Sequence, residues 1–216
     1  SRLIVGDGRS HLALGGERYD VIISEPSNPW MAGVAALFTR EFFEEAKARL
    51  GPGGLLCQWA HTYDISDSDL RSIVATFTAV FPHASLWLIG EGDILLIGSM
   101  DPIDARLEGI AQAWTRPGVA ADLIGVDVRD PETLLTLFAA SGARLGAYAG
   151  DAPLQIDDRM SLEFSGPQSI YGRSTTDNAA ALRALAQDGT LPAPVVAARS
   201  APGISMNRGL MLARAE

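Results

Sequence analysis

The feature that most constrains the fold is an alternation of short apolar runs with longer segments of helical spacing across residues 19–98. Tyr19–Ser24 has an apolar centre that is too short for a helix, and the Pro, Ser and Asn that follow end it abruptly. Such a run is typical of a buried parallel strand, and Leu55–Trp59 has the same character. Strands that alternate with helices predict an α/β fold built on a parallel sheet.

Two helices are predicted from apolar side chains that recur on one face. The first begins at the capping residue Thr39 and ends at Gly51. The second begins at the capping residue Ser66 and ends before Pro82. A Ser or Thr cap at the start and Gly or Pro at the end are the usual boundaries of a helix, so both predictions rest on more than periodicity.

Two further apolar runs, Ala84–Ile89 and Ile94–Gly98, flank a Gly-Glu-Gly-Asp turn. This pattern predicts a hairpin that closes the sheet with an antiparallel pair. At the other end, Leu3–Val5 is a short apolar run broken by Gly-Asp-Gly, and we interpret it as another strand that ends at a turn. The first structural unit is expected to end near Met100.

Beyond residue 100 the alternation of strands and helices gives way to mostly helical segments. The whole chain is therefore predicted to have three regions. Residues 1–100 form the α/β domain, 101–188 form a mostly helical C-terminal region, and 189–216, with several Pro and Ala residues, form a linker or loosely docked tail. Helices within the second region are expected at Ile103–Trp114, Pro131–Ser141 and Asn178–Gln187.

Composition excludes several classes of protein. The chain has 216 residues, 47% of them hydrophobic, and a net charge of −9. That charge opposes binding to a phosphate backbone, so we expect no nucleic-acid partner and favour cationic small molecules. Cys57 is the sole cysteine, which leaves no internal disulfide, and we expect it to be buried. No apolar run approaches the roughly 20 residues of a membrane span, so a cytoplasmic location is expected.

Candidate functional residues follow the predicted strands. Glu25 and Asn28 come directly after Tyr19–Ser24, with Trp30 and Met31 as apolar neighbours. Ligands in open α/β sheets bind beyond such strand ends, so these side chains are expected to line a crevice. Each also has an ordinary interpretation: a solvated acid for Glu25, a turn before proline for Asn28, and packing for the apolar pair.

His61, Tyr63 and Asp64 follow the next predicted strand and are expected on the same rim. A histidine or a phenol there is able to assist proton transfer, although a solvated rim is the competing interpretation. No two histidines have the spacing of metal ligands, and Arg159 beside Asp157 and Asp158 favours an ion-paired turn. No metal site is therefore predicted.

Three ordered blocks carry a resemblance to a known family. They are GDGRSHL at 6–12, YDVIISEPSNPW at 19–30 and LFTREFFEEAKARLGPGGLLCQW at 37–59. Together they resemble the later part of the spermidine synthase family of polyamine aminopropyltransferases. The chain is especially similar to the family's domains fused to membrane transporter segments, because IDDRMSLEFSGPQSIY at 156–171 resembles a segment that follows the catalytic-type domain there.

The resemblance implies the later part of a methyltransferase-like, Rossmann-type doubly wound sheet. The family's glycine-rich turn after the first strand and acidic residue after the second have no counterpart here, so the chain aligns from the third strand onward. The missing strands would lie between Leu3–Val5 and Tyr19–Ser24. We therefore infer a truncated chain, or one completed by another polypeptide.

The resemblance also implies a reaction and its residues. Family members move an aminopropyl group from decarboxylated S-adenosylmethionine to an amine in polyamine biosynthesis. Asp7, with the adjoining Gly8, matches the contact to adenine, and Glu25 matches the proton-accepting aspartate. Asn28 replaces a second aspartate that binds the amine, so a charge is lost there. Gln58 matches a glutamine near the acceptor pocket.

Two alternatives stay open at this point. An S-adenosylmethionine-dependent methyltransferase has the same fold, and Asn28-Pro29-Trp30 is similar to the polar-Pro-Pro-aromatic loop of amino-methyltransferases. A non-catalytic ligand-sensing domain attached to a transporter is favoured by Asn28. Family members usually associate, and the apolar edge of an incomplete sheet would favour a homo-oligomer. A membrane segment in the full-length protein, with this chain on its cytosolic side, is a further implication.

Overall fold

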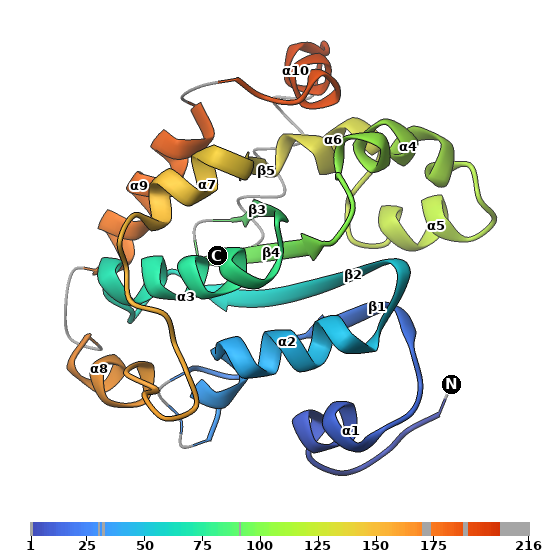
Figure 1. The fold of residues 1–216 in the computed structure, drawn as a ribbon. Helices are drawn as coiled ribbons and strands as arrows, with labels where there is room; N and C mark the ends of the chain where they lie inside the picture. The colour runs from blue at the N-terminus through green and yellow to red at the C-terminus, as the bar shows by residue number, and fades with distance from the viewer. Residues whose placement is uncertain are drawn as a thin grey trace.

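The computed structural model describes residues 2–29, 31, 33–90, 92–169, 174–187 and 190–203. Within them, one five-stranded mixed sheet runs through the molecule and helices pack on it (Figure 1). The predicted α/β class is therefore confirmed. The strands follow the order β1-β2-β4-β3-β5, with bounds β1 Tyr19–Ser24, β2 Leu50–His61, β3 His83–Ile89, β4 Asp93–Ser99 and β5 Phe138–Ser141.

β1 lies at the edge of the sheet and differs from the prediction in its burial. It pairs with β2 in parallel, as expected, but the three other strand pairs are antiparallel. Ile22 is buried, whereas Val21 is 52% and Ile23 72% exposed. The expectation of a fully buried strand is wrong because β1 has a sheet neighbour on one side only, and no described element covers the face that carries Val21 and Ile23.

The two helices predicted from capping residues are confirmed. In α2, Arg40–Arg49, the Thr39 hydroxyl accepts a hydrogen bond from the Phe42 amide. In α3, Asp67–Val80, the Ser66 hydroxyl accepts one from the Asp69 amide. The antiparallel hairpin of β3 and β4 is confirmed as well. A short 3₁₀-helix at Ala35–Phe38 precedes α2.

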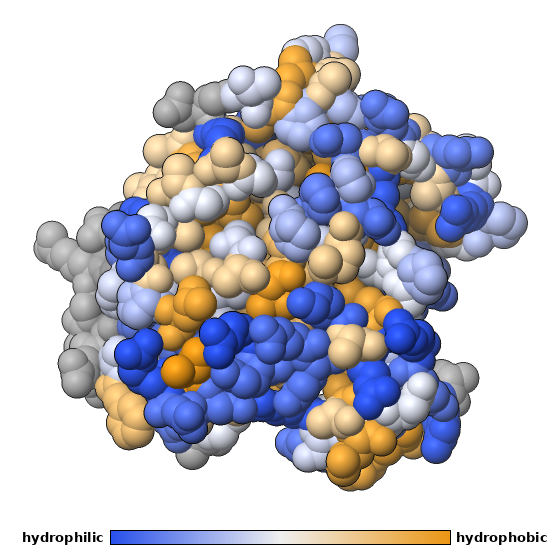
Figure 2. All heavy atoms as spheres, viewed as in Figure 1, coloured by the Kyte–Doolittle hydropathy of each residue, from blue (hydrophilic) through white to orange (hydrophobic). Residues whose placement is uncertain are grey.

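The N-terminal segment differs from its prediction. Leu3–Val5 forms no strand, because no other described strand lies beside it, and Leu3 and Val5 are more than 90% exposed. The Gly-Asp-Gly turn leads into a helix that the sequence pattern did not reveal, α1 at Gly8–Leu14. Figure 2 shows apolar residues gathered at the lower right, over this end of the molecule.

The C-terminal half contributes a strand as well as helices. The predicted helix at Pro131–Ser141 is correct only for α6, because Phe138–Ser141 forms β5 and pairs with β3. The boundary near Met100 therefore divides the chain but not the sheet. The helices of this half are α4 Asp104–Trp114, α5 Val119–Ile124, α6 Pro131–Thr136, α7 Gly142–Ala149, α8 Leu162–Ser169, α9 Ser174–Gln187 and α10 Ala193–Ser200.

Two hydrophobic clusters lie on opposite faces of the sheet. Ile94 and Leu96 of β4 belong to the cluster that includes residues of α2, α3, α7 and α9. Leu95 and Ile97 pack against the cluster formed with α4, α6 and α10. Because successive strand residues point to opposite faces, β4 is covered on both sides. Figure 1 shows α2 and α3 in front of the sheet.

The region predicted as a linker or loosely docked tail contains a packed helix. Val195 and Ala198 of α10 are buried in the second cluster. The Arg199 guanidinium donates hydrogen bonds to the carbonyl oxygens of Ala186 and Phe138. The described part of this region, residues 190–203, is therefore anchored to β5 and α9, which corrects the expectation of loose docking.

Candidate functional site

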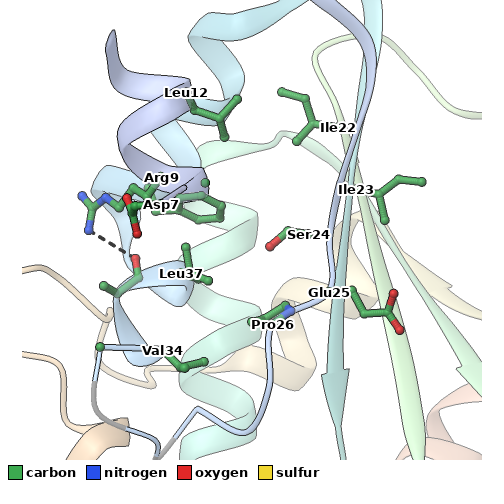
Figure 3. A pocket seen from close by; sticks show the side chains of 14 residues that line it. Asp7, Arg9, Leu12, Ile22, Ile23, Ser24, Glu25, Pro26, Val34 and Leu37 are labelled. Atoms are coloured by element: carbon green, nitrogen blue, oxygen red, sulfur yellow. Dashed lines mark hydrogen bonds between the residues drawn. The ribbon is translucent and has the colours of Figure 1, made fainter. Parts of the chain in front are cut away.

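A cavity of about 600 Å³ lies where β1 ends, between this strand, α1 and the 3₁₀-helix. Asp7, Gly8 and Glu25, three of the residues expected to act, line it together with Arg9. Its walls are otherwise mostly apolar, with Leu12, Ile22, Val34, Leu37 and Phe42 among them (Figure 3). An apolar cleft with a few polar groups is the usual form of a small-molecule site.

Asp7 has a structural task at this cavity. Its carboxylate caps α1, and Oδ1 accepts a hydrogen bond of 2.6 Å from the Ser10 amide. The backbone hydrogen bond from Ser10 lowers the pKa of this carboxyl, so the group is an anion at neutral pH. The interpretation of Gly-Asp-Gly as a turn is thus correct at Asp7.

Glu25 borders the same cavity but points in another direction. Figure 3 shows Ile22 and Ser24 turned toward α1, and Ile23 and Glu25 turned to the opposite side of the strand. Ser24 pairs with Gln58, so Glu25 extends the row of Ile23 and faces the same way as Cys57 and Trp59 of β2. The two carboxylates therefore lie on opposite sides of the strand end.

Glu25 is exposed, and acidic and aromatic residues of β2 and β4 lie on the same side of the sheet. Trp59 and His61 lie two residues apart on β2 and therefore share one face of the sheet. Asp93 of β4 pairs with His61. The ring of His61 lies 5.4 Å from Trp59 and 4.5 Å from Tyr63 between centroids. Burial and the neighbouring Glu25 raise the pKa of Asp93, while a hydrogen bond from Trp59 opposes this effect. Carboxylates beside aromatic faces suit an ammonium ligand.

His61 and Tyr63 lie on the predicted rim, and the environment of each shifts the pKa of its side chain. His61 is 1% exposed, and burial lowers its pKa to about 4. The imidazole is therefore neutral at neutral pH. Burial, then the charges of Asp93 and Asp64, raise the pKa of the Tyr63 phenol. The interpretation of His61 as a solvated rim residue is wrong.

The three other candidates, Gln58, Asn28 and Trp30, differ in their structural settings. Gln58 is fully buried, its amide donates to the Trp59 carbonyl, and it faces the α2 and α3 side, away from His61 and Tyr63. The Asn28 carbonyl accepts a hydrogen bond from the Met31 amide, as the turn interpretation predicts. Trp30 lies outside the described residues.

Sequence reasoning missed Asp93 and Arg9. Asp93 lies in a hairpin strand whose apolar pattern gave no reason to expect a functional acid. The Arg9 guanidinium donates to both Glu45 and Asp157, which raises its pKa. Asp157 is thus ion-paired, but with Arg9 rather than with its neighbour Arg159. The only available signal was the presence of Arg9 and Asp157 in two of the blocks that carry the family resemblance.

The structure also bears on the remaining predictions. His11 lies on the exposed surface of α1, and His83 begins β3. The Cys57 thiol is only partly buried, and burial followed by the charge of Glu25 raises its pKa. Among the described residues no group of three His, Cys, Asp or Glu side chains is placed to hold a metal ion. No described helix is both long and apolar enough to cross a membrane.

Comparisons with known proteins find similar segments in several curated relatives. A polyamine aminopropyltransferase of Hyperthermus butylicus is 32% identical over 107 residues, which cover 47% of this chain and 35% of the relative. A putrescine N-methyltransferase of Nicotiana tabacum is 35% identical over 37% of this chain and 22% of the relative. A spermidine synthase of Dictyostelium discoideum is 36% identical over 38% and 28%. The chain thus spans about a third or less of the length of these relatives.

One solved structure is also similar to the chain. A probable spermidine synthase from Corynebacterium glutamicum aligns with a TM-score of 0.45 and 21% identity, over 71% of this chain and 53% of that protein. The family comparison is more specific, because residues 1–89 match the Spermine/spermidine synthase domain. This match contains Asp7, Glu25 and the whole of β1 to α3. Residues 1–89 of this chain are therefore similar to the spermine and spermidine synthase family.

Proposed function

We propose that the protein transfers an aminopropyl group from decarboxylated S-adenosylmethionine to an amine in polyamine biosynthesis. The observation that carries the proposal is that Asp7 and Glu25, both within the family match, border one cavity at the end of β1. Its volume of about 600 Å³ fits a nucleoside-sized ligand. The apolar walls suit the adenosine and thioether parts of the donor.

The proposed step is a nucleophilic substitution at carbon. The lone pair of the acceptor nitrogen attacks the aminopropyl carbon bonded to the sulfonium, forming a C–N bond. The C–S bond breaks, its electron pair stays on sulfur, and methylthioadenosine leaves. The attacking nitrogen must be a neutral amine at the moment of attack, so Glu25 accepts its proton directly or through a water molecule.

The donor and the amine would bind on opposite sides of the end of β1. Asp7 and Gly8 would hold the adenine on the α1 side, where both line the cavity. Glu25 would hold and deprotonate the amine on the Trp59 side, where Asp93 supplies a second carboxylate. His61 pairs with Asp93, and its imidazole is neutral there. Asn28, which follows the end of β1, would contact the amine.

Methyl transfer to an amine is a second candidate. The putrescine N-methyltransferase is 35% identical to this chain, and the aminopropyltransferase is 32% identical. Enzymes of both reactions therefore contain a segment similar to this chain. The chemical step is of the same kind, with a methyl in place of an aminopropyl carbon. A non-catalytic ligand-sensing role, which the uncharged Asn28 favours, is the third. The choice between donors depends on whether the site accepts a carboxylate on the donor's side chain.

Calorimetric titration of the full-length protein with methylthioadenosine, decarboxylated S-adenosylmethionine and S-adenosylmethionine distinguishes the three candidates. Product analysis with a panel of mono- and diamines follows. Preference for the decarboxylated donor with aminopropyl transfer supports the proposal. Preference for S-adenosylmethionine with methylated product favours the second candidate. Absence of nucleoside binding contradicts both enzymatic functions and favours a sensing domain.

Two variants test the roles of the loop residues. Glu25→Gln is expected to slow the chemical step by about 10²-fold, the usual scale for loss of a general base. Glu44→Gln, an exposed acid on α2, is the matched control and should react normally. Asn28→Asp is expected to lower the KM for diamines. Normal turnover of Glu25→Gln would remove Glu25 from the mechanism, and an unchanged diamine KM would count against Asn28 as an acceptor contact.

A further inference from the structure

Helix α1 has only a small apolar anchor, the partly buried side chain of Leu12, which packs against the first hydrophobic cluster. It has seven residues, and none of them is buried. Helices shorter than about 12 residues are marginal in water, so an element of this size depends on tertiary contacts. Asp7 caps this helix, and Gly8 is its first residue, so both move with it. Whatever fixes α1 therefore also fixes one wall of the cavity.

The side chain of Arg9 makes the most extensive of these contacts. Nε and Nη2 donate to the two carboxylate oxygens of Glu45 in α2, at 3.1 and 3.2 Å. Nη1 and Nη2 donate to the two oxygens of Asp157, at 2.9 and 2.7 Å. Nη1 also reaches the carbonyl of Ala36, which lines the cavity. Paired bonds between a guanidinium and a carboxylate fix direction as well as distance.

Asp157 itself is held in place by the surrounding segment. Its Oδ1 accepts a second hydrogen bond, of 2.7 Å, from the Thr39 hydroxyl, and its amide donates to Glu41. Two residues earlier, Gln155 is buried. Its side-chain amide donates to the hydroxyls of Ser72 and Ser161, and its backbone carbonyl accepts a hydrogen bond from the Arg40 amide. The segment is therefore a rigid support that connects α2 and α3 with α1.

We propose that Asp157 is a positioning residue for the nucleoside side of the cavity, through Arg9 and α1. It lies 68 residues beyond the family match, which ends at residue 89. The ordering of this wall thus comes from the C-terminal half of the chain. This inference rests on the proposed function for the identity of the ligand, but the Arg9 to Asp157 contact stands independently of it.

The test compares Asp157→Ala with Asp158→Ala in the full-length protein. Asp158 is the adjacent acid, is exposed, and makes no hydrogen bond or ion pair in the described part of the chain, so it is a matched control. Three quantities are measured: the Kd of methylthioadenosine, the KM of the amine, and hydrogen exchange of the amides at 10–14. Asp157→Asn, which keeps the acceptor oxygen but loses the charge, should lie between Asp157→Ala and the natural protein.

Asp157→Ala is expected to raise the Kd of methylthioadenosine about tenfold, the scale of losing one charge-assisted hydrogen-bonded pair. Exchange in α1 should become faster, while the amine KM stays unchanged because Glu25 lies on the other side of the strand. A normal Kd, or equal losses in Kd and amine KM, would overturn the inference and leave the proposed function intact.

A protein that binds no nucleoside at all would instead contradict the proposed function. The exchange measurement still decides the structural half of the inference in that case. Faster exchange in α1 for Asp157→Ala alone supports the role of Asp157 in positioning this helix. Equal exchange in Asp157→Ala and Asp158→Ala overturns it.

Discussion

Helices α1 and α3 are attached to the same molecule by different forces. α3 has 14 residues, nine of them buried, and its Phe77 ring packs against Phe43 at 5.1 Å and Phe81 at 5.0 Å between centroids. α1 has no buried residue and is held by Arg9, Arg49 and their partners. Hydrophobic burial therefore stabilises the centre of the sheet, whereas directed polar contacts place the cavity wall.

The contrast is tested most strongly at Phe77. Phe77→Ala is expected to lower the free energy of unfolding by about 3 to 5 kcal/mol, because it removes a ring from a close-packed cluster. Leu12→Ala, the corresponding truncation in α1, should cost only about 1 kcal/mol because Leu12 is partly buried. Urea titration measures both. Losses of equal size would show that α1 is also held by burial.

Overpacking beneath α3 is the next largest effect. A Cβ at Gly98 of β4 would lie 2.5 Å from Cγ of Phe81 and 2.8 Å from Cζ of Phe77. Gly98→Ala is therefore expected to destabilise the protein by about 1 to 3 kcal/mol. Gly109→Ala in α4 is the control, since its Cβ meets nothing within 4 Å. Thermal denaturation separates them, and equal melting temperatures would contradict the close packing.

Acid should lower the free energy of unfolding through the buried residue His61. Its pKa is about 4 in the folded protein and about 6.5 when unfolded, so the unfolded chain binds more protons between these values. Stability is then present above pH 6.5 and is lost as the pH falls toward 4, with a slope of at most about 1.4 kcal/mol per pH unit. His61→Gln should lose less stability over this range in urea titrations. Carboxylates, including the facing Asp93, titrate in both proteins, and parallel curves would contradict the assignment.

The smallest global effect is expected at Arg49. Its guanidinium donates to the carbonyl oxygens of Leu12 and Ala13 at the end of α1, at 2.6 and 2.8 Å. Arg49→Ala should lower the free energy of unfolding by only about 1 kcal/mol, yet accelerate hydrogen exchange in α1 and leave α3 unchanged. Lys47→Ala in the same helical turn of α2 is the control. Equal acceleration in both helices would show that α1 has no separate attachment.

The prediction succeeded where local signals and burial agree. Thr39 and Ser66 begin helices as predicted, since each side chain accepts a hydrogen bond from its own helix. It failed at Phe138–Ser141, which continues the apolar pattern of α6 but forms β5 because β3 offers a pairing edge. It also failed for the burial of β1, since strand periodicity does not reveal whether a sheet continues beyond that strand.

The sequence by itself determined the order of α-helices and strands from Tyr19 to Ser99, the resemblance of residues 1–89 to the spermine and spermidine synthases, and the candidates Asp7 and Glu25. These follow from local spacing and contiguous motifs. Only the tertiary structure decided that Glu25 faces Trp59, that Asp93 joins it, and that Asp157 holds Arg9 across 148 residues. Such contacts depend on sheet register and on long-range packing, and neither leaves a periodic signal in the chain.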